Sequence, residues 1–383
     1  MRVAFYAPMK APTDPVPSGD RKIARLFIRA LDDGGHDVML ASRFRSWEGQ
    51  GDEVKQQRLR NVGCRLATRV SRHYCALPAG RQPEAWFTYH LYHKAPDWLG
   101  PAVSRQLGIP YVVAEASYAP KQAAGPWAMG LEAAATAIAS AAAILALKSY
   151  DIPCLLPLLD DPRRLVRFKP FLDASEHAQR ECDEVSRREL QQHFGLDNRR
   201  PWLLTVAMMR YGNKLACYEV LGQALRRLTG QPVSLLIVGD GPARAEVQAA
   251  FKGIEPHQVI FAGLQSQETL QAFYGAADLF AWPAVDEPFG MALLEAQAAG
   301  LPVVAGASRG VPDVVHQQVS GVLVPPGNVD AFADALAALL ENRRRLGEMG
   351  AAAKALVAKE HDIRSAASKL NAILERVRAG EVP

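Results

Sequence analysis

Runs of apolar residues alternate with helical patterns from one end of the chain to the other. In the first half, buried strands are predicted at residues 3–6, 37–41, 85–89, 111–114 and 143–147. Helices are predicted between them at residues 20–33, 96–107 and 127–140. Strands that alternate with helices are typical of βαβ units, in which helices cover both faces of a parallel sheet. The pattern therefore predicts an α/β fold.

The second half repeats this alternation with elements of its own. Strands are predicted at residues 202–206, 234–238, 259–262, 279–281, 303–305 and 321–324, and helices at 216–228, 243–251, 267–276, 290–299 and 330–340. Between the halves, residues 149–173 hold four prolines and little periodicity, which is typical of a stiff linker. We therefore expect two domains, at residues 1–168 and 174–360, and expect the C-terminal helix within 361–383 to pack back on the first.

Two sheets of this kind also predict where a ligand binds. Open parallel sheets bind ligands beyond the carboxyl ends of their strands. Ligand sites also occur preferentially between domains. We therefore expect a site in a cleft between the two domains.

Composition and charge narrow the function classes. The 383 residues are 49% hydrophobic and 22% charged, as in a globular protein of two or three domains. The net charge of +4 is too weak over this length to favour nucleic-acid binding. No apolar run reaches the roughly 20 residues that cross a bilayer, and the first residues lack the apolar stretch of a secretory signal. Reduced thiols in the cytoplasm are expected, because the cysteines are odd in number and form no CxxC pair: Cys64, Cys75, Cys154, Cys182 and Cys217.

Basic residues are concentrated in one part of the first half. Residues 41–82 hold nine basic side chains, from Arg43 to Arg81, and three acidic ones. Two interpretations stay open at this point. The segment is either a solvated helix face with long side chains or a surface for an anionic membrane or an acidic acceptor.

The most informative segment lies between residues 281 and 304. There a strand leads into a loop, and Pro288 is suited to the first turn of a helix that ends at Gly300. The backbone N–H groups of Phe289, Gly290 and Met291 would then be unpaired donors at a helix N-terminus. Such a terminus favours anions, and Gly290 would let a ligand approach closely.

Two glutamates flank this helix start. Glu287 and Glu295 are eight residues apart, which is about 12 Å along the axis if the chain between them is helical. Carboxylates that share one glycosidic bond lie roughly 5 to 9.5 Å apart. The spacing therefore predicts a grip on the two ends of an elongated ligand, such as a nucleotide-sugar.

At these residues the sequence resembles the retaining glycosyltransferases of family 4. The Glu-x7-Glu spacing matches that family, and further similar motifs occur at residues 205–210, 236–242, 261–264, 277–280, 310–313 and 321–325. The resemblance implies the GT-B fold, in which two Rossmann-like doubly wound domains face each other across a cleft. It also implies transfer of a sugar from a nucleotide-sugar to an acceptor hydroxyl with retention of anomeric configuration.

The resemblance assigns roles to matching residues of the second half. It implies that Glu287 contacts the donor sugar and that Glu295 contacts the ribose hydroxyls. The backbone around Gly263 and Leu264 would contact the base. The donor is expected to be a UDP- or GDP-sugar, with no other cofactor.

Arg210 and Lys214 are expected to bind the diphosphate of the donor. The resemblance implies this role, and fixed cations stabilise the negative charge that develops on a departing nucleoside diphosphate. No Asp-x-Asp motif is present to anchor a metal ion. We therefore expect catalysis that is independent of a metal.

The first half carries two further candidate features. Gly19, in the segment Ser18-Gly19-Asp20-Arg21, resembles a residue of the family's glycine-containing loop that faces the donor phosphates. A plain capped helix is the alternative.

Two histidines and a glutamate follow buried strands of the first half. His90 and His93 follow the strand at 85–89, where an imidazole could bind an oxygen of the acceptor or donor. Many family members carry a histidine after the strand at 111–114, but this chain has Glu115 there. The acceptor-side residue therefore stays open among these three, with structural roles as the alternative.

Other functions are compatible with two doubly wound domains. A nicotinamide-dependent oxidoreductase would use Gly239 and Gly241, although Arg244 stands where the dinucleotide fingerprint requires a third glycine. A GT-B epimerase or phosphorylase, or a non-catalytic protein that binds sugar nucleotides, is a further alternative. The expected acceptor is a sugar, a lipid-linked sugar or a small molecule. The expected location is the cytoplasm, with peripheral contact at the inner face of the membrane through residues 43–81.

Overall fold

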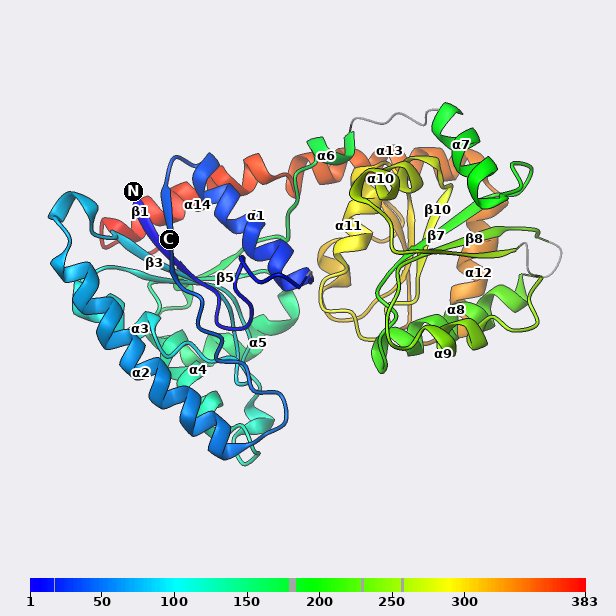
Figure 1. Ribbon diagram of the computed structural model, residues 1–383. Coiled ribbons are helices and arrows are strands. Elements are labelled where there is room, and N and C mark those ends of the chain that lie inside the picture. Colours follow the sequence, from blue (N-terminus) through cyan, green and yellow to red (C-terminus); the bar gives the residue numbers. More distant parts are fainter. Residues whose placement is uncertain (17, 179–183, 229–230, 256–257) are drawn as a thin grey trace. The chain divides into compact units, whose positions relative to one another are not determined.

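The computed structural model describes the chain except for residues 17, 179–183, 229–230 and 256–257 (Figure 1). It forms two units, of which the first comprises Met1–Lys169 and Ile363–Pro383 and the second Pro170–Asp362. Cys182 lies outside the described residues, and the other four cysteines are free thiols.

The first unit is built on a parallel sheet of six strands in the order β2-β1-β3-β4-β5-β6. These strands are β1 (Arg2–Tyr6), β2 (Asp37–Ser42), β3 (Ala85–Leu91), β4 (Tyr111–Ala116), β5 (Ala143–Ala146) and β6 (Leu165–Arg167). The main helices are α1 (Gly19–Asp33), α2 (Glu53–Ala76), α3 (Gly100–Leu107), α4 (Ala128–Ser140) and α14 (Ile363–Arg378). The predicted strands of this half are all present.

Alternating side chains of the strands pack against two helical layers. Tyr6 and Trp86 belong to a core cluster with buried residues of α2, α3 and α4. Phe5 and Phe87 stack on the opposite face, where Phe27 of α1 lies 5.4 Å from Phe87. Helix α14 packs on α1 in this second layer (Figure 1).

The segment at residues 149–173 is not a linker throughout, so this prediction is wrong in part. Most of it folds in the first unit as α5 (Ile152–Leu155), short 3₁₀ turns and the edge strand β6. The segment folds onto the first unit because apolar side chains between its prolines are buried there. Leu155 is fully buried, and the ring of Phe168 lies 6.0 Å from that of Phe27.

Helix α2 occupies most of the basic segment, as the interpretation of a solvated helix face requires, although no bounds were predicted for this helix. Its buried face consists of small or polar residues, which hides the apolar periodicity that normally reveals a helix. These residues recur at three-, four- and seven-residue spacings: Gln56, Gly63, Ala67, Ser71 and Tyr74.

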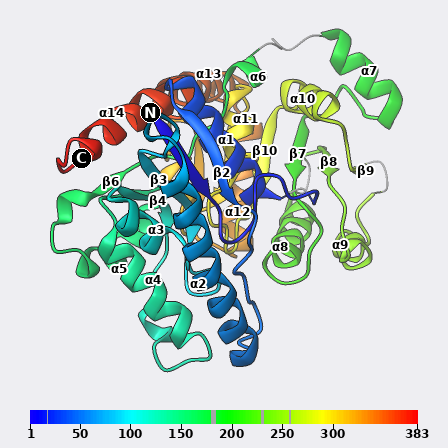
Figure 2. The same ribbon diagram turned by 60° about the vertical axis from the view of Figure 1, so that its left-hand side comes forward.

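The second unit has its own parallel sheet in the order β12-β11-β10-β7-β8-β9. Its strands are β7 (Trp202–Val206), β8 (Ser234–Val238), β9 (Val259–Gly263), β10 (Leu279–Trp282), β11 (Val303–Gly306) and β12 (Gly321–Val324). Its helices are α6 (Ser175–Ala178), α7 (Glu184–Phe194), α8 (Asn213–Arg227), α9 (Arg244–Ala250), α10 (Gln267–Ala276), α11 (Met291–Ala298), α12 (Val329–Leu340) and α13 (Arg343–Glu360). Figure 2 shows α8 and α9 on one face of this sheet and α10 on the other.

In each sheet, the direction in which successive strands are added changes once, and this point indicates where the candidate sites lie. The reversal falls between β1 and β3 in the first sheet and between β7 and β10 in the second. Loops that follow the two central strands diverge at such a point and leave room for a ligand beyond the carboxyl ends. The loops after β1, β3, β7 and β10 are therefore the first places to examine.

Candidate active site

The first turn of α8, which follows β7, and the loop after β10 bring Lys214 and Glu287 together in the second unit. Lys214 Nζ lies 2.5 Å from Glu287 Oε2, and the indole N–H of Trp282 donates to the same oxygen at 3.2 Å. The Lys214 ammonium also lies 5.0 Å from the centre of the Trp282 ring. The side chain of Glu287 is 13% exposed, so it remains accessible while held in place.

The backbone of the Glu287 loop is fixed from two sides. The amide of Glu287 donates to Ser308 Oγ at 3.0 Å, and that hydroxyl donates to the carbonyl of Ala284 at 2.5 Å. The neighbouring Asp286 accepts hydrogen bonds from Asn213 and from Arg309. These contacts place the carboxylate of Glu287 without depending on a ligand.

Glu295 lies one turn into α11 and is almost buried, with 7% exposure. The hydroxyl of Tyr274 donates to Glu295 Oε2 at 3.0 Å. Burial raises the pKa of Tyr274 well above its usual value, and the Glu295 carboxylate raises it further. Tyr274 therefore stays protonated and orients Glu295 as a hydrogen-bond donor.

The start of α11 differs from the prediction. Pro288 is not in the first turn, because Gly290 adopts a φ of +75° and serves as the N-cap of a helix that begins at Met291. The axial spacing estimated between Glu287 and Glu295 therefore does not apply, since Glu287 precedes the helix. Within the described chain, the amides of Gly290 and Met291 have no hydrogen-bond acceptor.

Arg210 lies four residues before Lys214 in the loop that follows β7 and precedes α8. Its side chain is exposed, and it forms no ion pair with the carboxylates of the described residues. A solvent-facing guanidinium is suited to an anionic ligand, as are the free amides of a helix N-terminus.

The loop after β9 carries Gly263 and Leu264. Gly263 has a φ of +68°, and a side chain there would meet no atom within 4 Å. Leu264 is 78% exposed, so it packs on nothing in its own unit. The backbone here is open to a ligand.

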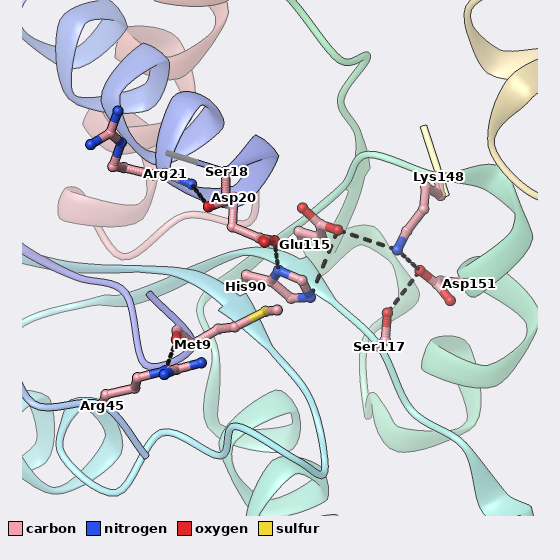
Figure 3. Close-up of polar contacts among 10 residues, drawn as sticks. All are labelled: Met9, Ser18, Asp20, Arg21, Arg45, His90, Glu115, Ser117, Lys148 and Asp151. Carbon is pink, nitrogen blue, oxygen red and sulfur yellow. Dashed lines mark hydrogen bonds and ion pairs between the residues drawn. The ribbon is translucent and has the colours of Figure 1, made fainter. Parts of the chain in front are cut away.

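In the first unit, polar side chains gather at the carboxyl ends of the central strands (Figure 3). His90 Nδ1 lies 2.9 Å from Asp20 Oδ1, and His90 Nε2 lies 3.9 Å from Glu115 Oε1. Lys148 Nζ lies 3.3 Å from the same Glu115 oxygen and 3.1 Å from Asp151 Oδ2. The structure thus brings together His90 and Glu115, two of the three acceptor-side candidates.

The third candidate, His93, has different surroundings. Its ring lies 5.2 Å from that of Tyr92 and 5.8 Å from that of Trp127. Burial lowers the pKa of His93, and Lys94 and Lys121 lower it further. His93 is therefore a neutral ring packed among aromatic residues, outside the cluster around His90.

Gly19 opens helix α1 close to this cluster. Ser18 caps the helix, since its Oγ accepts the amide of Arg21 at 3.2 Å. A side chain at Gly19 would meet nothing within 4 Å, and its φ is not in the left-handed range. Neither packing nor backbone conformation requires a glycine here, and the structure shows the capped helix that the alternative interpretation predicts.

A family model and curated relatives match part of the chain. Residues 200–342 match the family model described as glycosyl transferases group 1. A GDP-mannose-dependent alpha-(1-6)-phosphatidylinositol monomannoside mannosyltransferase of Mycobacterium tuberculosis is 34% identical over 197 residues, which cover 49% of this chain and 50% of that protein. A D-inositol 3-phosphate glycosyltransferase of Nocardia farcinica is 40% identical over 136 residues, which cover 33% and 30%. The matched segments therefore span half or less of these relatives.

Residues 200–342 belong to the glycosyl transferases group 1 family. The fold agrees over a longer range. The structure of Anabaena HepE in complex with UDP matches with a TM-score of 0.74 and 16% identity, covering 98% of this chain and 100% of that one. The chain thus has the GT-B fold, and both the fold and the family predicted from the sequence are confirmed.

In this GT-B chain the glycines after β8 serve a structural purpose. A side chain at Gly239 would meet the carbonyl of Ala207 at 2.0 Å, and one at Gly241 the carbonyl of Met209 at 2.2 Å. The amide of Met209 also donates to the carbonyl of Asp240 at 3.0 Å. The glycines therefore let the loop after β7 pack closely against them.

Several residues of both sites were not singled out from the sequence. Lys148 directly follows a buried strand, which is a usable signal. No comparable position next to a predicted strand marks Ser308, Asn213 or Tyr274, since their contacts join segments that are far apart in the chain. Among the residues that the structure describes, no group of three or more His, Cys, Asp or Glu side chains is placed to hold a metal ion.

Proposed function

We propose that the chain is a glycosyltransferase that transfers a sugar from a nucleotide-sugar to an acceptor hydroxyl, with retention of configuration and without a metal ion. The observation that carries the proposal is the Lys214–Glu287 pair, at the strand reversal of a unit that belongs to a glycosyltransferase family. Exposed Arg210 and the free amides at the start of α11 accompany it.

The second unit would bind the donor. Arg210, Lys214 and the amide of Gly290 would receive the diphosphate, and stabilising its charge as the glycosidic bond breaks would lower the barrier. Lys214 would then exchange Glu287 for a phosphate oxygen and leave Glu287 for the sugar hydroxyls. One relative is named for a GDP-mannose donor and one matching structure holds UDP, so both nucleotides are proposed.

The nucleoside would be held farther along the same unit. Glu295, with one oxygen fixed by Tyr274, would accept the ribose hydroxyls. The open backbone at Gly263 and the exposed Leu264 would contact the base.

The first unit would bind the acceptor, and its helix α2 would contact an anionic surface. Four exposed arginines of α2 fall within about 60° of one another around the helix axis at 3.6 residues per turn, opposite the buried face: Arg58, Arg65, Arg69 and Arg72. Each basic side chain near an anionic leaflet contributes about 1 kcal/mol, weakened by salt. The relatives named for phosphatidylinositol and inositol-phosphate acceptors support this, and in the described chain no helix is long and apolar enough to span a membrane. A cytoplasmic enzyme that contacts the inner membrane face is therefore proposed.

The donor assignment can be tested with nucleotides alone. A ligand at 100 times its Kd stabilises the folded chain by about 2.7 kcal/mol, so thermal denaturation with UDP, GDP and ADP and their sugars should identify the donor. Release of nucleoside diphosphate only when an acceptor is supplied would separate transfer from an epimerase or a binding protein. NMR of the first product would report its anomeric configuration. Absence of stabilisation by every nucleotide would contradict the proposal.

The membrane contact needs a separate experiment. Co-sedimentation with phosphatidylglycerol-containing vesicles at low salt should fall when the four arginines of α2 are changed to Gln. A matched control changes four exposed arginines elsewhere in the first unit: Arg29, Arg105, Arg163 and Arg376. Equal binding of the two variants would show that α2 has no special role.

A further inference from the structure

The ends of β3 and β4 are bent in the same unusual way. His90 has a φ of +62° and Glu115 a φ of +58°, a range that residues other than glycine rarely adopt. The two positions are also neighbours in the sheet, because Tyr89 pairs with Ala114 and Leu91 with Ala116. The paired bends turn both side chains toward one another beyond the carboxyl end of the sheet (Figure 3).

The contacts of His90 leave one ring nitrogen for a ligand. Nδ1 is held by Asp20 at 2.9 Å, whereas Nε2 lies 3.9 Å from Glu115 Oε1, which is too far for a hydrogen bond. The His90 side chain is 15% exposed, so a ligand can reach the ring.

Glu115 is a buried charge with incomplete pairing. Its side chain is 1% exposed, and Lys148 lies 3.3 Å from Oε1. Its other oxygen, Oε2, is buried and has no hydrogen-bond partner among the described residues. The charge of this carboxylate acts on the imidazole of His90, whose Nε2 faces Oε1 at 3.9 Å.

The charges around His90 favour its protonated form. Two carboxylates face the ring, Asp20 from α1 and Glu115 from β4, against the ammonium of Lys148 after β5. Burial lowers the pKa of His90, but Glu115 and Asp20 outweigh it, so the pKa is raised above the ordinary value.

Other charged and titratable groups nearby are engaged elsewhere or neutral. Lys10 lies 3.6 Å from Asp14, although its charge also lowers the pKa of Asp20, and Arg45 donates to the carbonyl of Met9. Asp151 lies beyond Lys148, at 3.1 Å from its ammonium. Burial raises the pKa of Tyr89 and Tyr92, so both phenols stay neutral.

We propose that Glu115 is a positioning residue that, together with Asp20, keeps His90 as an imidazolium, so that Nε2–H is a cationic hydrogen-bond donor to a negatively charged oxygen of a substrate. Asp20 alone would orient the ring in either protonation state. Glu115 decides between them, since a carboxylate facing Nε2 favours a proton there over a lone pair. This role rests on the proposed function, and it sets His90 apart from a general base, which needs a neutral ring.

The experiment combines Glu115→Gln, which removes the charge at nearly constant shape, with Glu115→Asp as the conservative variant. Imidazole NMR of the full chain, assigned against His90→Asn, gives the titration of His90 without substrate. The pH profile of kcat/KM shows whether the activity follows the titration of His90. Asp151→Asn is the matched control, because it removes the same charge from the far side of Lys148.

In Glu115→Gln the His90 titration should move to lower pH, and the alkaline fall of kcat/KM should move with it, while activity on the acid side is retained. Glu115→Asp should restore most of the displacement, and Asp151→Asn should cause a smaller one. An unchanged titration in Glu115→Gln, or activity that rises with pH through the His90 titration, would overturn the proposal. If Glu115→Gln does not fold, wild-type His90 that titrates no higher than an ordinary histidine would also overturn it. The NMR measurement stands even if no transfer is detected, so failure of the proposed function is seen separately.

Discussion

Substituting the glycine that caps α11 should destabilise the second unit by a predictable amount. Gly290 has a φ of +75°, and a Cβ there would lie 2.5 Å from Leu293 Cδ1. A left-handed backbone costs a residue with a Cβ roughly 1–2 kcal/mol. Overpacking against a fixed neighbour costs typically about 1–3 kcal/mol more. Gly290→Ala should therefore reduce the free energy of unfolding by about 2–5 kcal/mol.

Gly300, beyond the other end of α11, is the matched control. It has a similar φ of +81°, but the nearest atoms to an added Cβ lie 3.8 Å away, at an ordinary contact distance. Gly300→Ala should thus cost only the roughly 1–2 kcal/mol of placing a Cβ on a left-handed backbone. The change from glycine to alanine lowers the conformational entropy of the unfolded chain equally in both variants. Equilibrium urea denaturation measures the difference. If Gly290→Ala loses no more stability than Gly300→Ala, the contact with Leu293 is not a real constraint.

Three further predictions concern the donor site. Arg210→Ala should fold normally and lower kcat by about a hundredfold to a thousandfold. The reason is that losing one donor to a developing charge raises the barrier by about 2.7–4 kcal/mol. Near-normal kcat would show that Arg210 does not bind the diphosphate. Tyr274→Phe should lower the free energy of unfolding by about 1.5–3 kcal/mol, since a buried carboxylate loses a hydrogen bond. It should also weaken nucleotide binding. Wild-type affinity in this variant would show that Glu295 binds the nucleotide without being oriented by Tyr274. Activity should persist in excess EDTA, and a loss restored by Mg²⁺ or Mn²⁺ would show that a metal takes part.

Sequence periodicity predicted the sheet better than it predicted the helices that cover it. Strands such as β8, which is buried along its whole length and apolar after Ser234, are easily recognised. The bounds of helix α2 could not be predicted because Gly63, Ala67 and Ser71 form its buried face, although a solvated helix face was one of two interpretations of this segment. The start of α11 was misplaced because the left-handed conformation of Gly290 outweighs the usual preference of proline for a first turn.

The candidate sites were predictable only where their residues share a segment. Glu287 and Glu295 were singled out through their spacing, and Arg210 and Lys214 through a motif after a strand. The Glu115–Lys148 contact joins the ends of two different strands, and Tyr274 reaches Glu295 from another helix. Such partners are set by the order of strands in the sheet, which a single sequence does not state.

The return of the last helix to the first unit has a consequence for synthesis on the ribosome. Seven residues of α14 are buried, and the helix packs on α1 at the other end of the chain. All of the second unit, Pro170–Asp362, emerges before α14 does. One face of α1 therefore stays uncovered until residues 363–378 have been synthesised, although the rest of the first unit is made before the second unit. A nascent chain arrested after Lys169 should accordingly bind chaperones that recognise exposed apolar surface, and release them once residues 363–378 are available.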